Sequence, residues 1–275
     1  MRTRLFNVIW MSVWPLRVYI TRFPFPRGKG FLTRRLLIPL LPPAPAMVPA
    51  ASGGEDTILL QHRETVGLSY LMRGTFESVE IESARQLAAD GTWAFDVGAH
   101  VGLFSIPLSR AVGSSGAVVA FEPLPDNARR LRENLARNTV LNVRVWEAAA
   151  SHSEGEVELR LANDSAFTST AEVFLGRATG TAIRVPSVTL DRVWQEAGQP
   201  QVAIMKVDVE GAELDVLSGG RALISACSPA ILVEVNTGLH LTRLTEWLGM
   251  YGYIRSQPAG FMPWNYLFLS GERGD

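Results

Sequence analysis

The chain has 275 residues and a formal net charge of −1, with 47% hydrophobic and 19% charged residues, a composition that excludes a disordered protein. Its single cysteine, Cys227, excludes a disulfide framework and a zinc site built from cysteines. The charge is uneven, because the first 54 residues hold eight of the 26 basic residues and none of the 27 acidic ones. The acidic remainder argues against a broad nucleic-acid surface.

Residues 1–54 are predicted to form a basic, Pro-rich N-terminal arm and linker. Their apolar run at 5–16 is interrupted and is followed by Arg17, so we expect neither a membrane-spanning helix nor a cleaved secretory signal. Aromatic residues mixed with arginines suggest peripheral membrane contact through residues 1–50, and the alternative is an extension that packs on the domain. We expect a cytoplasmic location, with or without this membrane contact.

The folded domain is expected over 55–275, with an N-terminal cover at 55–91 and a core at 92–270. The cover should hold a strand at 57–62 and a helix at 78–89. In the core, the predicted strands are 93–97, 117–121, 143–148, 203–207, 230–235 and 266–269, and the predicted helices are 102–111, 125–137, 212–226 and 241–251. Apolar strands that alternate with helices predict an α/β fold, a doubly wound sheet with helices on both faces. Residues 153–190 break this rhythm and predict an inserted pair of antiparallel strands.

In such a sheet, ligands bind outside the carboxyl ends of the strands. The first core strand ends at Asp96, and Gly98, His100 and Gly102 follow before the helix. Glycines there would let the backbone approach a ligand, and the start of the helix offers N–H groups. The spacing is not the dinucleotide fingerprint, because His100 replaces its middle glycine. The alternative is a close-packed turn that binds nothing.

The next strands also end in polar residues. Glu122 ends the second strand, where a carboxylate could hold a ribose diol, although an ordinary exposed acid would look the same. Lys206, Asp208 and Glu210 alternate at the end of the fourth strand, so they should share one face, and burying them without partners would be costly. The fifth strand ends with Glu234 and Asn236. These polar ends predict a site at one edge of the sheet.

Four segments together resemble the FkbM family of S-adenosylmethionine-dependent methyltransferases: FDVGAHVG (95–102), FEPLPDN (121–127), SEGEVELRL (153–161) and KVDVEGAELDVLSGG (206–220). The resemblance covers about residues 92–270, and His100 stands where the family usually has Asn. It implies a class I methyltransferase domain with a Rossmann-like, seven-stranded sheet and an antiparallel C-terminal hairpin. It also implies transfer of a methyl group from S-adenosylmethionine to a hydroxyl of a sugar, glycan or natural product.

The resemblance implies roles for the polar strand ends. The residues expected to bind S-adenosylmethionine are Asp96, Gly98, His100, Gly102, Glu122 and Ala148, the last lying among small residues that would leave room for adenine. The expected catalytic residues are Lys206, Asp208 and Glu210, which would take the proton of the acceptor hydroxyl or orient it. The less favoured alternative is a Mg²⁺ ion held by Asp208, Glu234 and Asn236. Phe261 and Trp264 could line the acceptor pocket or pack in the core.

Two rival functions stay open. A nicotinamide-dependent oxidoreductase could use a similar sheet, but the missing fingerprint and the KVDVEG strand end argue against it. A membrane-docked scaffold without catalysis would explain the arm, but not the acids at each strand end. A nucleic-acid methyltransferase would normally carry an Asp/Asn-Pro-Pro-aromatic tetrad where this chain has DVEG, so no nucleic acid is expected as a partner. The sequence indicates neither the acceptor nor the oligomeric state.

Overall fold

The computed structural model describes residues 46–49, 56–61, 64, 66, 67, 69, 70, 75–162 and 178–271. The predictions for the arm at 1–45, including most of the expected membrane contact, lie outside these residues. The expected linker contains a strand, β1 (Ala46–Pro49), which its Pro-rich composition does not predict. This strand pairs antiparallel with β2 (Thr57–Leu60) of the N-terminal cover. No helix in the described part of the chain is long and apolar enough to cross a membrane.

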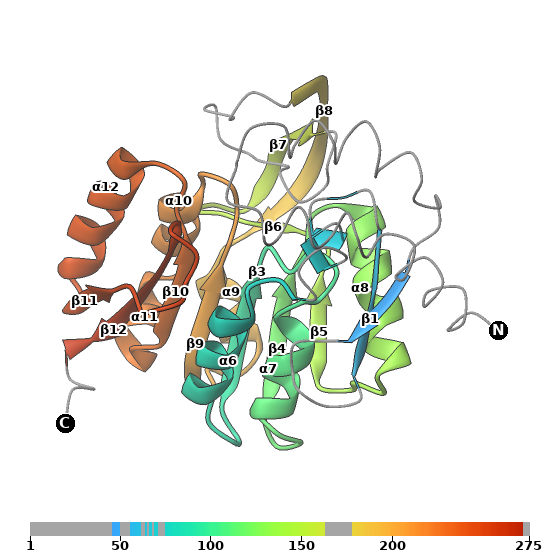
Figure 1. Ribbon diagram of the computed structural model, residues 1–275. Coiled ribbons are helices and arrows are strands. Elements are labelled where there is room, and N and C mark those ends of the chain that lie inside the picture. The colour runs from blue at the N-terminus through green and yellow to red at the C-terminus, as the bar shows by residue number, and fades with distance from the viewer. Residues whose placement is uncertain are drawn as a thin grey trace, which may run out of the picture.

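The central sheet has seven strands, and Figure 1 shows it as the middle layer of the molecule. Its order is β11 (Tyr253–Ser256), β12 (Asn265–Ser270), β10 (Ala230–Glu234), β9 (Val202–Val207), β3 (Trp93–Val97), β4 (Ala117–Phe121) and β5 (Val143–Trp146). Only β12 runs antiparallel to its neighbours β10 and β11; the remaining pairs are parallel. The predicted seven-stranded sheet with an antiparallel C-terminal hairpin is confirmed, and its strand order reverses between β3 and β9.

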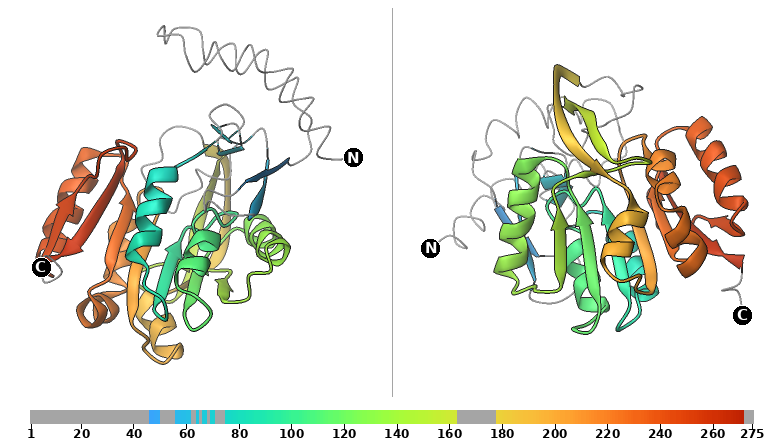
Figure 2. Two further views of the ribbon diagram at one scale, coloured as in Figure 1. Left: turned by 60° about the horizontal axis from the view of Figure 1, so that its bottom comes forward. Right: turned by 180° about the vertical axis from the view of Figure 1, so that it is seen from behind.

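Helices cover both faces of this sheet (Figure 2). One hydrophobic cluster takes in α6 (Ser78–Leu87), α7 (Ser105–Ala111) and α8 (Pro125–Arg137), and a second takes in α9 (Leu190–Glu196), α10 (Glu213–Ser218), α11 (Arg221–Cys227) and α12 (Gly238–Gly249). The strands divide their residues between the two: in β4, Val118 and Ala120 join the first cluster, and Val119 and Phe121 join the second. Alternation along each strand therefore builds a core on both faces.

Several element boundaries differ from the prediction. The helix expected at 212–226 is two helices, α10 and α11, separated at Gly219 and Gly220. A Cβ on Gly219 would lie 2.1 Å from the Ser151 carbonyl oxygen, so the chain needs a glycine at this close approach. The helix expected from residue 102 begins only at Ser105, because the preceding residues form turns. The third core strand ends at Trp146 rather than at residue 148.

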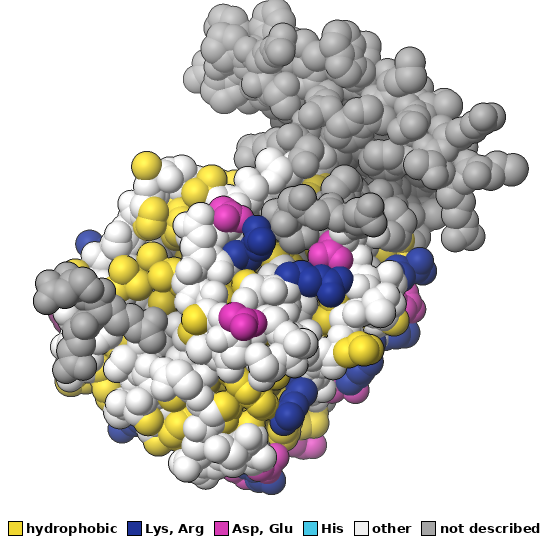
Figure 3. Space-filling model, turned by 90° about the horizontal axis from the view of Figure 1, so that it is seen from below, with side chains coloured by type: hydrophobic (Ala, Val, Ile, Leu, Met, Phe, Trp, Pro, Cys, Tyr) yellow, Lys and Arg dark blue, Asp and Glu magenta, His cyan; other side chains and the backbone are white. Residues whose placement is uncertain are grey.

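A second sheet stands beside the carboxyl ends of the main strands. It contains β6 (Ala149–Ala150), β8 (Ala178–Val188) and β7 (Gly155–Ala162), in that order, and β7 and β8 pair antiparallel as predicted for the insertion. Figure 1 shows this hairpin rising above the main sheet. On the face seen from below, charged side chains of both signs are dispersed among hydrophobic and neutral ones (Figure 3).

Candidate active site

A cavity of about 360 Å³ lies at the carboxyl ends of the central strands, where the strand order reverses. Every site residue predicted from the sequence lines this cavity except Gly102. Glu234, Asn236 and Trp264 line it too, and Leu159 of β7 adds an apolar contact from the inserted sheet. The topology thus brings the polar strand ends together, as ligand sites in open α/β sheets require.

The glycines after β3 are explained by packing within the protein. Gly98 has a φ of 85°, and a Cβ there would lie 1.9 Å from the backbone oxygen of Asp208. Gly102 has a φ of 97°, and its Cβ would lie 2.8 Å from a methyl group of Leu131. The amides of Gly98 and Ala99 both donate to the Phe121 carbonyl, at 3.0 and 2.9 Å. The turn therefore fits closely against β4 and the segment after β9, while Gly98 still forms part of the cavity wall.

His100 occupies the same turn with a φ of 50°, in the left-handed region that non-glycine residues rarely adopt. Its backbone N–H donates to the Glu122 Oε2 at 2.8 Å. Asn, which the family resemblance leads us to expect here, tolerates this conformation well, and His is also enriched in it. The left-handed backbone therefore restricts which residues fit at this position, and His100 also lines the cavity.

His100→Val should lower the free energy of unfolding by about 1–2 kcal/mol, because a β-branched residue is strongly disfavoured at positive φ. His100→Asn is the matched control and should leave stability close to that of the wild type. Urea unfolding of both variants checks this. Equal stability of the Val and Asn variants would show that the left-handed backbone does not constrain the position.

Asp96 in β3 and Glu122 immediately after β4 are buried carboxyl groups at neighbouring strand ends. Glu122 accepts hydrogen bonds from the amides of His100 at 2.8 Å and Leu124 at 2.9 Å, and from the Asn127 side chain at 3.4 Å. Burial raises the pKa of Glu122 to about 7, although these hydrogen bonds oppose the rise. Asp96 accepts from the Ser105 hydroxyl at 2.5 Å, and burial raises its pKa to about 6. Hydrogen bonds thus hold both groups in place at the cavity wall. Because their pKa values are about 6 and about 7, both groups change charge close to neutral pH.

Lys206 brings a buried positive charge to the cavity. Its side chain is 2% exposed, and its Nζ lies 3.4 Å from the Asp208 Oδ2 and 5.1 Å from the centre of the Phe104 ring. The Nζ has no hydrogen-bond partner among the described residues. Burial would lower the pKa of this amine, but the surrounding carboxylates, Asp208 foremost, raise it above its ordinary value. Lys206 is therefore an ammonium group with N–H donors to offer.

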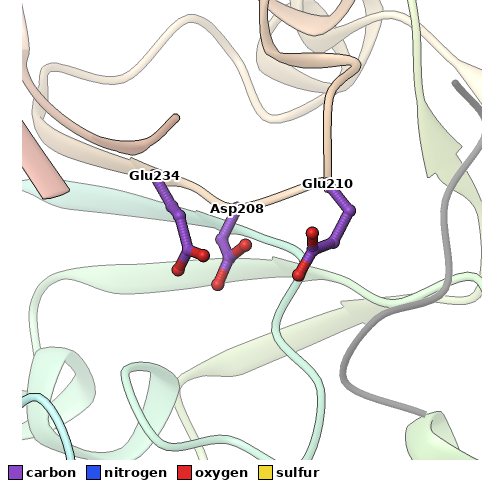
Figure 4. A group of neighbouring side chains, drawn as sticks. All are labelled: Asp208, Glu210 and Glu234. Atoms are coloured by element: carbon purple, nitrogen blue, oxygen red, sulfur yellow. The ribbon is translucent and has the colours of Figure 1, made fainter. Parts of the chain in front are cut away.

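Three acidic side chains, Asp208, Glu210 and Glu234, gather near the ends of β9 and β10 (Figure 4). Oxygen atoms of Asp208, Glu210 and Glu234 lie within 4.8 Å of one another. The predicted alternation does not produce this arrangement, because β9 ends at Val207 and Glu210 adopts a left-handed φ of 54° in the turn that follows. Burial, followed by the nearby Asp208 charge, raises the pKa of Glu210 to about 8 and that of Glu234 well above its usual range. Glu210 thus holds its proton at neutral pH.

The oxygen-rich cluster differs in membership from the predicted metal set. Glu210 takes the place expected for Asn236, whose side-chain nitrogen donates to Glu210 and Glu234 at 3.3 Å each. An asparagine would bind a cation through its oxygen, so this orientation matches acid–amide pairing instead. The Lys206 ammonium group compensates part of the negative charge.

No motif marks Glu77, a further acidic residue in the cavity wall. Glu77 precedes α6 in the N-terminal cover and accepts from the Asn265 side chain, 188 residues away, at 2.8 Å. Nothing local in the sequence marks such a pair. Of the two C-terminal aromatic residues considered above, Trp264 lines the cavity, whereas Phe261 packs against the first hydrophobic cluster.

Comparisons with known proteins point to methyltransferases. The Methyltransferase FkbM domain family matches residues 96–255. The hexuronic acid methyltransferase AglP of Haloferax volcanii is 26% identical over 204 residues, 74% of this chain and 79% of that protein. Methyltransferase sdnD of Sordaria araneosa is 30% identical over 152 residues, 45% of this chain and 58% of that protein.

Among solved structures, a methyltransferase FkbM from Methylobacillus flagellatus KT is similar, with a TM-score of 0.47 and 18% identity. The similar region covers 74% of this chain and 52% of that one, so this chain spans about half the length of that solved protein. The matched range 96–255 holds the glycine turn, Glu122, Lys206 and the three clustered acids. Because this range covers more than half of the 275 residues, the chain belongs to the methyltransferase FkbM domain family.

Proposed function

We propose that this protein transfers a methyl group from S-adenosylmethionine to a hydroxyl group of a sugar, glycan or natural product. The observation that carries the proposal is that Asp96 and Glu122 line the same cavity as the Lys206–Asp208 ion pair. One end thus offers a cofactor site of the kind found at strand ends, and the other offers acid–base groups. The similarity to a methyltransferase named for hexuronic acid supports a sugar acceptor.

The residues at the first end fit the cofactor chemically. Two hydroxyls of a ribose could donate to Glu122, and Asp96 could hold the methionine ammonium. Ala148, Ala149 and Ala150 line the cavity with small apolar side chains, which suits a flat adenine ring. When bound, S-adenosylmethionine supplies an electrophilic methyl group on a sulfonium, so the protein mainly has to hold the acceptor in line with it.

The residues at the second end can prepare a hydroxyl for attack. Lys206 is charged, so its role is to donate a hydrogen bond to the acceptor oxygen rather than to remove a proton. Removal of the hydroxyl proton then belongs to a carboxylate, and Asp208 is the carboxylate paired with that ammonium. Glu210 is largely protonated at neutral pH and is better placed to orient the acceptor. A Mg²⁺ ion on the same acids stays an untested alternative.

Ligand-dependent thermal stability tests the cofactor assignment. S-adenosylhomocysteine should raise the melting temperature, whereas NAD should not, because binding to the native state alone stabilises it. Transfer of a labelled methyl group to a panel of neutral glycosides and hexuronides then identifies the acceptor. Stabilisation by NAD and not by S-adenosylhomocysteine would favour the oxidoreductase alternative instead.

Glu122→Gln should weaken binding of S-adenosylhomocysteine by about 1–3 kcal/mol, the usual loss when a charged hydrogen-bonding group is removed. Calorimetry measures this affinity. Glu147→Gln is the matched control, because the Glu147 side chain is 44% exposed outside the cavity and should leave binding unchanged. If both variants bind as the wild type does, Glu122 does not hold the ribose.

Affinity for S-adenosylhomocysteine should also fall as the pH drops through about 7 and then about 6. The ligand needs the ionised carboxylates, and the pKa values of Glu122 and Asp96 are raised to about 7 and about 6.

The stability of the protein depends on pH as well. A raised carboxyl pKa means that the folded protein binds this proton more tightly than the unfolded chain. Stability from Glu122 is therefore present at low pH and is lost as pH rises from about 4.5 to about 7. The Glu122→Gln variant should lack its share of both effects.

A further inference from the structure

Glu77 is the carboxylate of the cavity wall that lies outside the matched family range. It immediately precedes α6, which packs against β9 and β10, the strands that carry Lys206 and Glu234. Glu77 is 5% exposed and adopts a left-handed backbone with a φ of 47°. It makes no side-chain hydrogen bond that caps α6. Burial raises the pKa of Glu77 above its usual range, and the nearby Lys206 charge opposes this rise by favouring the carboxylate. A buried carboxyl group in a strained conformation without a capping role calls for another explanation, and such strain is common at functional sites.

The C-terminal hairpin fixes the position of this carboxylate. Asn265 at the start of β12 is fully buried, and its side-chain nitrogen donates to the Glu77 Oε1 at 2.8 Å and to the Glu80 Oε1 at 3.3 Å. The backbone N–H of Met262 also donates to Glu80. In the sheet, Asn265 lies directly opposite Glu234. Two segments outside residues 96–255 therefore meet at the acceptor end of the cavity.

Lys206 is the group that needs such a partner. Its ammonium group is buried, and among the described residues it forms an ion pair with Asp208 alone, at 3.4 Å. A buried charge is stable only with enough compensation from opposite charges or hydrogen bonds, and the Nζ has no hydrogen-bond partner there. Glu77 lines the same cavity, where low dielectric strengthens the attraction between opposite charges.

We propose that Glu77 is a positioning residue for methyl transfer, whose carboxylate keeps the Lys206 ammonium group charged and directed into the cavity, where it donates to the acceptor oxygen. The role in transfer rests on the proposed function, but the effect on Lys206 does not. Glu77 acts through Lys206, so its loss should change the charge state of that lysine without emptying the cofactor end of the cavity.

The chain allows a direct test, because Lys206 and Lys29 are its only lysines. Full-length protein labelled with ¹⁵N and ¹³C in lysine gives two side-chain signals, which a Lys29→Arg variant assigns. In the wild type, Lys206 should titrate at higher pH than Lys29. Glu77→Gln and Glu77→Gly should each lower the pH midpoint of Lys206 by at least about one unit, a tenfold change in its protonation equilibrium. The Lys29 signal should not move.

Two variants keep this test independent of folding. Glu77→Gly suits the left-handed backbone, which offsets part of the stability lost with the Asn265 hydrogen bond, so it should stay folded while losing the charge. Glu82→Gln, on the exposed side of α6 and 48% exposed, removes a carboxylate of the same helix and should leave Lys206 unchanged. A structural role alone would leave the Lys206 midpoint as in the wild type, whatever the melting temperatures of the Glu77 variants.

Unchanged Lys206 midpoints in folded Glu77→Gln and Glu77→Gly would overturn the proposal. Calorimetry with S-adenosylhomocysteine on the same samples separates this failure from that of the proposed function. If the wild type does not bind the ligand, the cofactor assignment fails, whereas the lysine titration still decides whether Glu77 acts on Lys206. With an acceptor identified, both variants should lower kcat, and Glu77→Asp should recover part of it.

Discussion

Asp208→Asn should lower the turnover number for methyl transfer at least about a hundredfold, the usual scale for losing a positioned acid–base group. The substitution keeps the size of the side chain but removes the ion pair with Lys206. The backbone contacts should persist, because the Asp208 N–H donates to the Val97 carbonyl at 2.9 Å whichever side chain is present. Affinity for S-adenosylhomocysteine should stay close to the wild-type value.

Turnover, cofactor affinity and melting temperature measured on one preparation decide the role of Asp208. A metal role would add loss of wild-type activity with a chelator and recovery with Mg²⁺. A purely structural role would lower the melting temperature and leave turnover per folded molecule unchanged. Turnover near the wild-type value in a well-folded variant would remove Asp208 from the mechanism.

The sheet was predictable because its signals are local. Apolar strands such as 117–121 are short, continuous runs of hydrophobic residues. Each strand that ends in the cavity has a polar residue at or just after its carboxyl end. The strand and its site residue could therefore be identified together. The topology of an open α/β sheet then brings those ends to one place. This explains why residues as distant as Asp96 and Lys206 could be assigned to one site in advance.

The features that the sequence could not reveal depend on contacts between distant segments. Glu77 and Asn265 are hydrogen-bonded, but they lie 188 residues apart in the sequence, and neither belongs to a motif. The division of the expected helix at 212–226 depends on the Ser151 carbonyl, which approaches Gly219 from another part of the chain. Likewise, the Glu210 carboxyl group lies close to that of Asp208 because the backbone turns after β9. The alternation of polar residues in the sequence would predict this only if the extended strand continued through residue 210.

The contact between Gly98 and Asp208 should make Gly98→Ala one of the most destabilising single substitutions in this protein. Two effects act at once: alanine is disfavoured at a φ of 85°, and its Cβ would lie 1.9 Å from the Asp208 backbone oxygen. That oxygen belongs to the segment after β9, so the alanine would push it away from β3 and displace Asp208. We expect a loss of about 4–5 kcal/mol in the free energy of unfolding, near the upper limit for single substitutions.

Gly198→Ala separates the two effects, because Gly198 has nearly the same φ, 87°, with nothing within 4 Å of its added Cβ. That variant should lose only about 1–2 kcal/mol, the cost of the left-handed backbone. Urea unfolding measures both, and the excess loss in Gly98→Ala is the cost of the clash. In the folded fraction of Gly98→Ala, the displaced Asp208 should also lower the turnover number. Gly198→Ala should leave the turnover number unchanged. Equal losses of stability in the two variants would mean that the strand ends move apart easily, and that the glycine turn does not fix the distance between the cofactor and the acid–base pair.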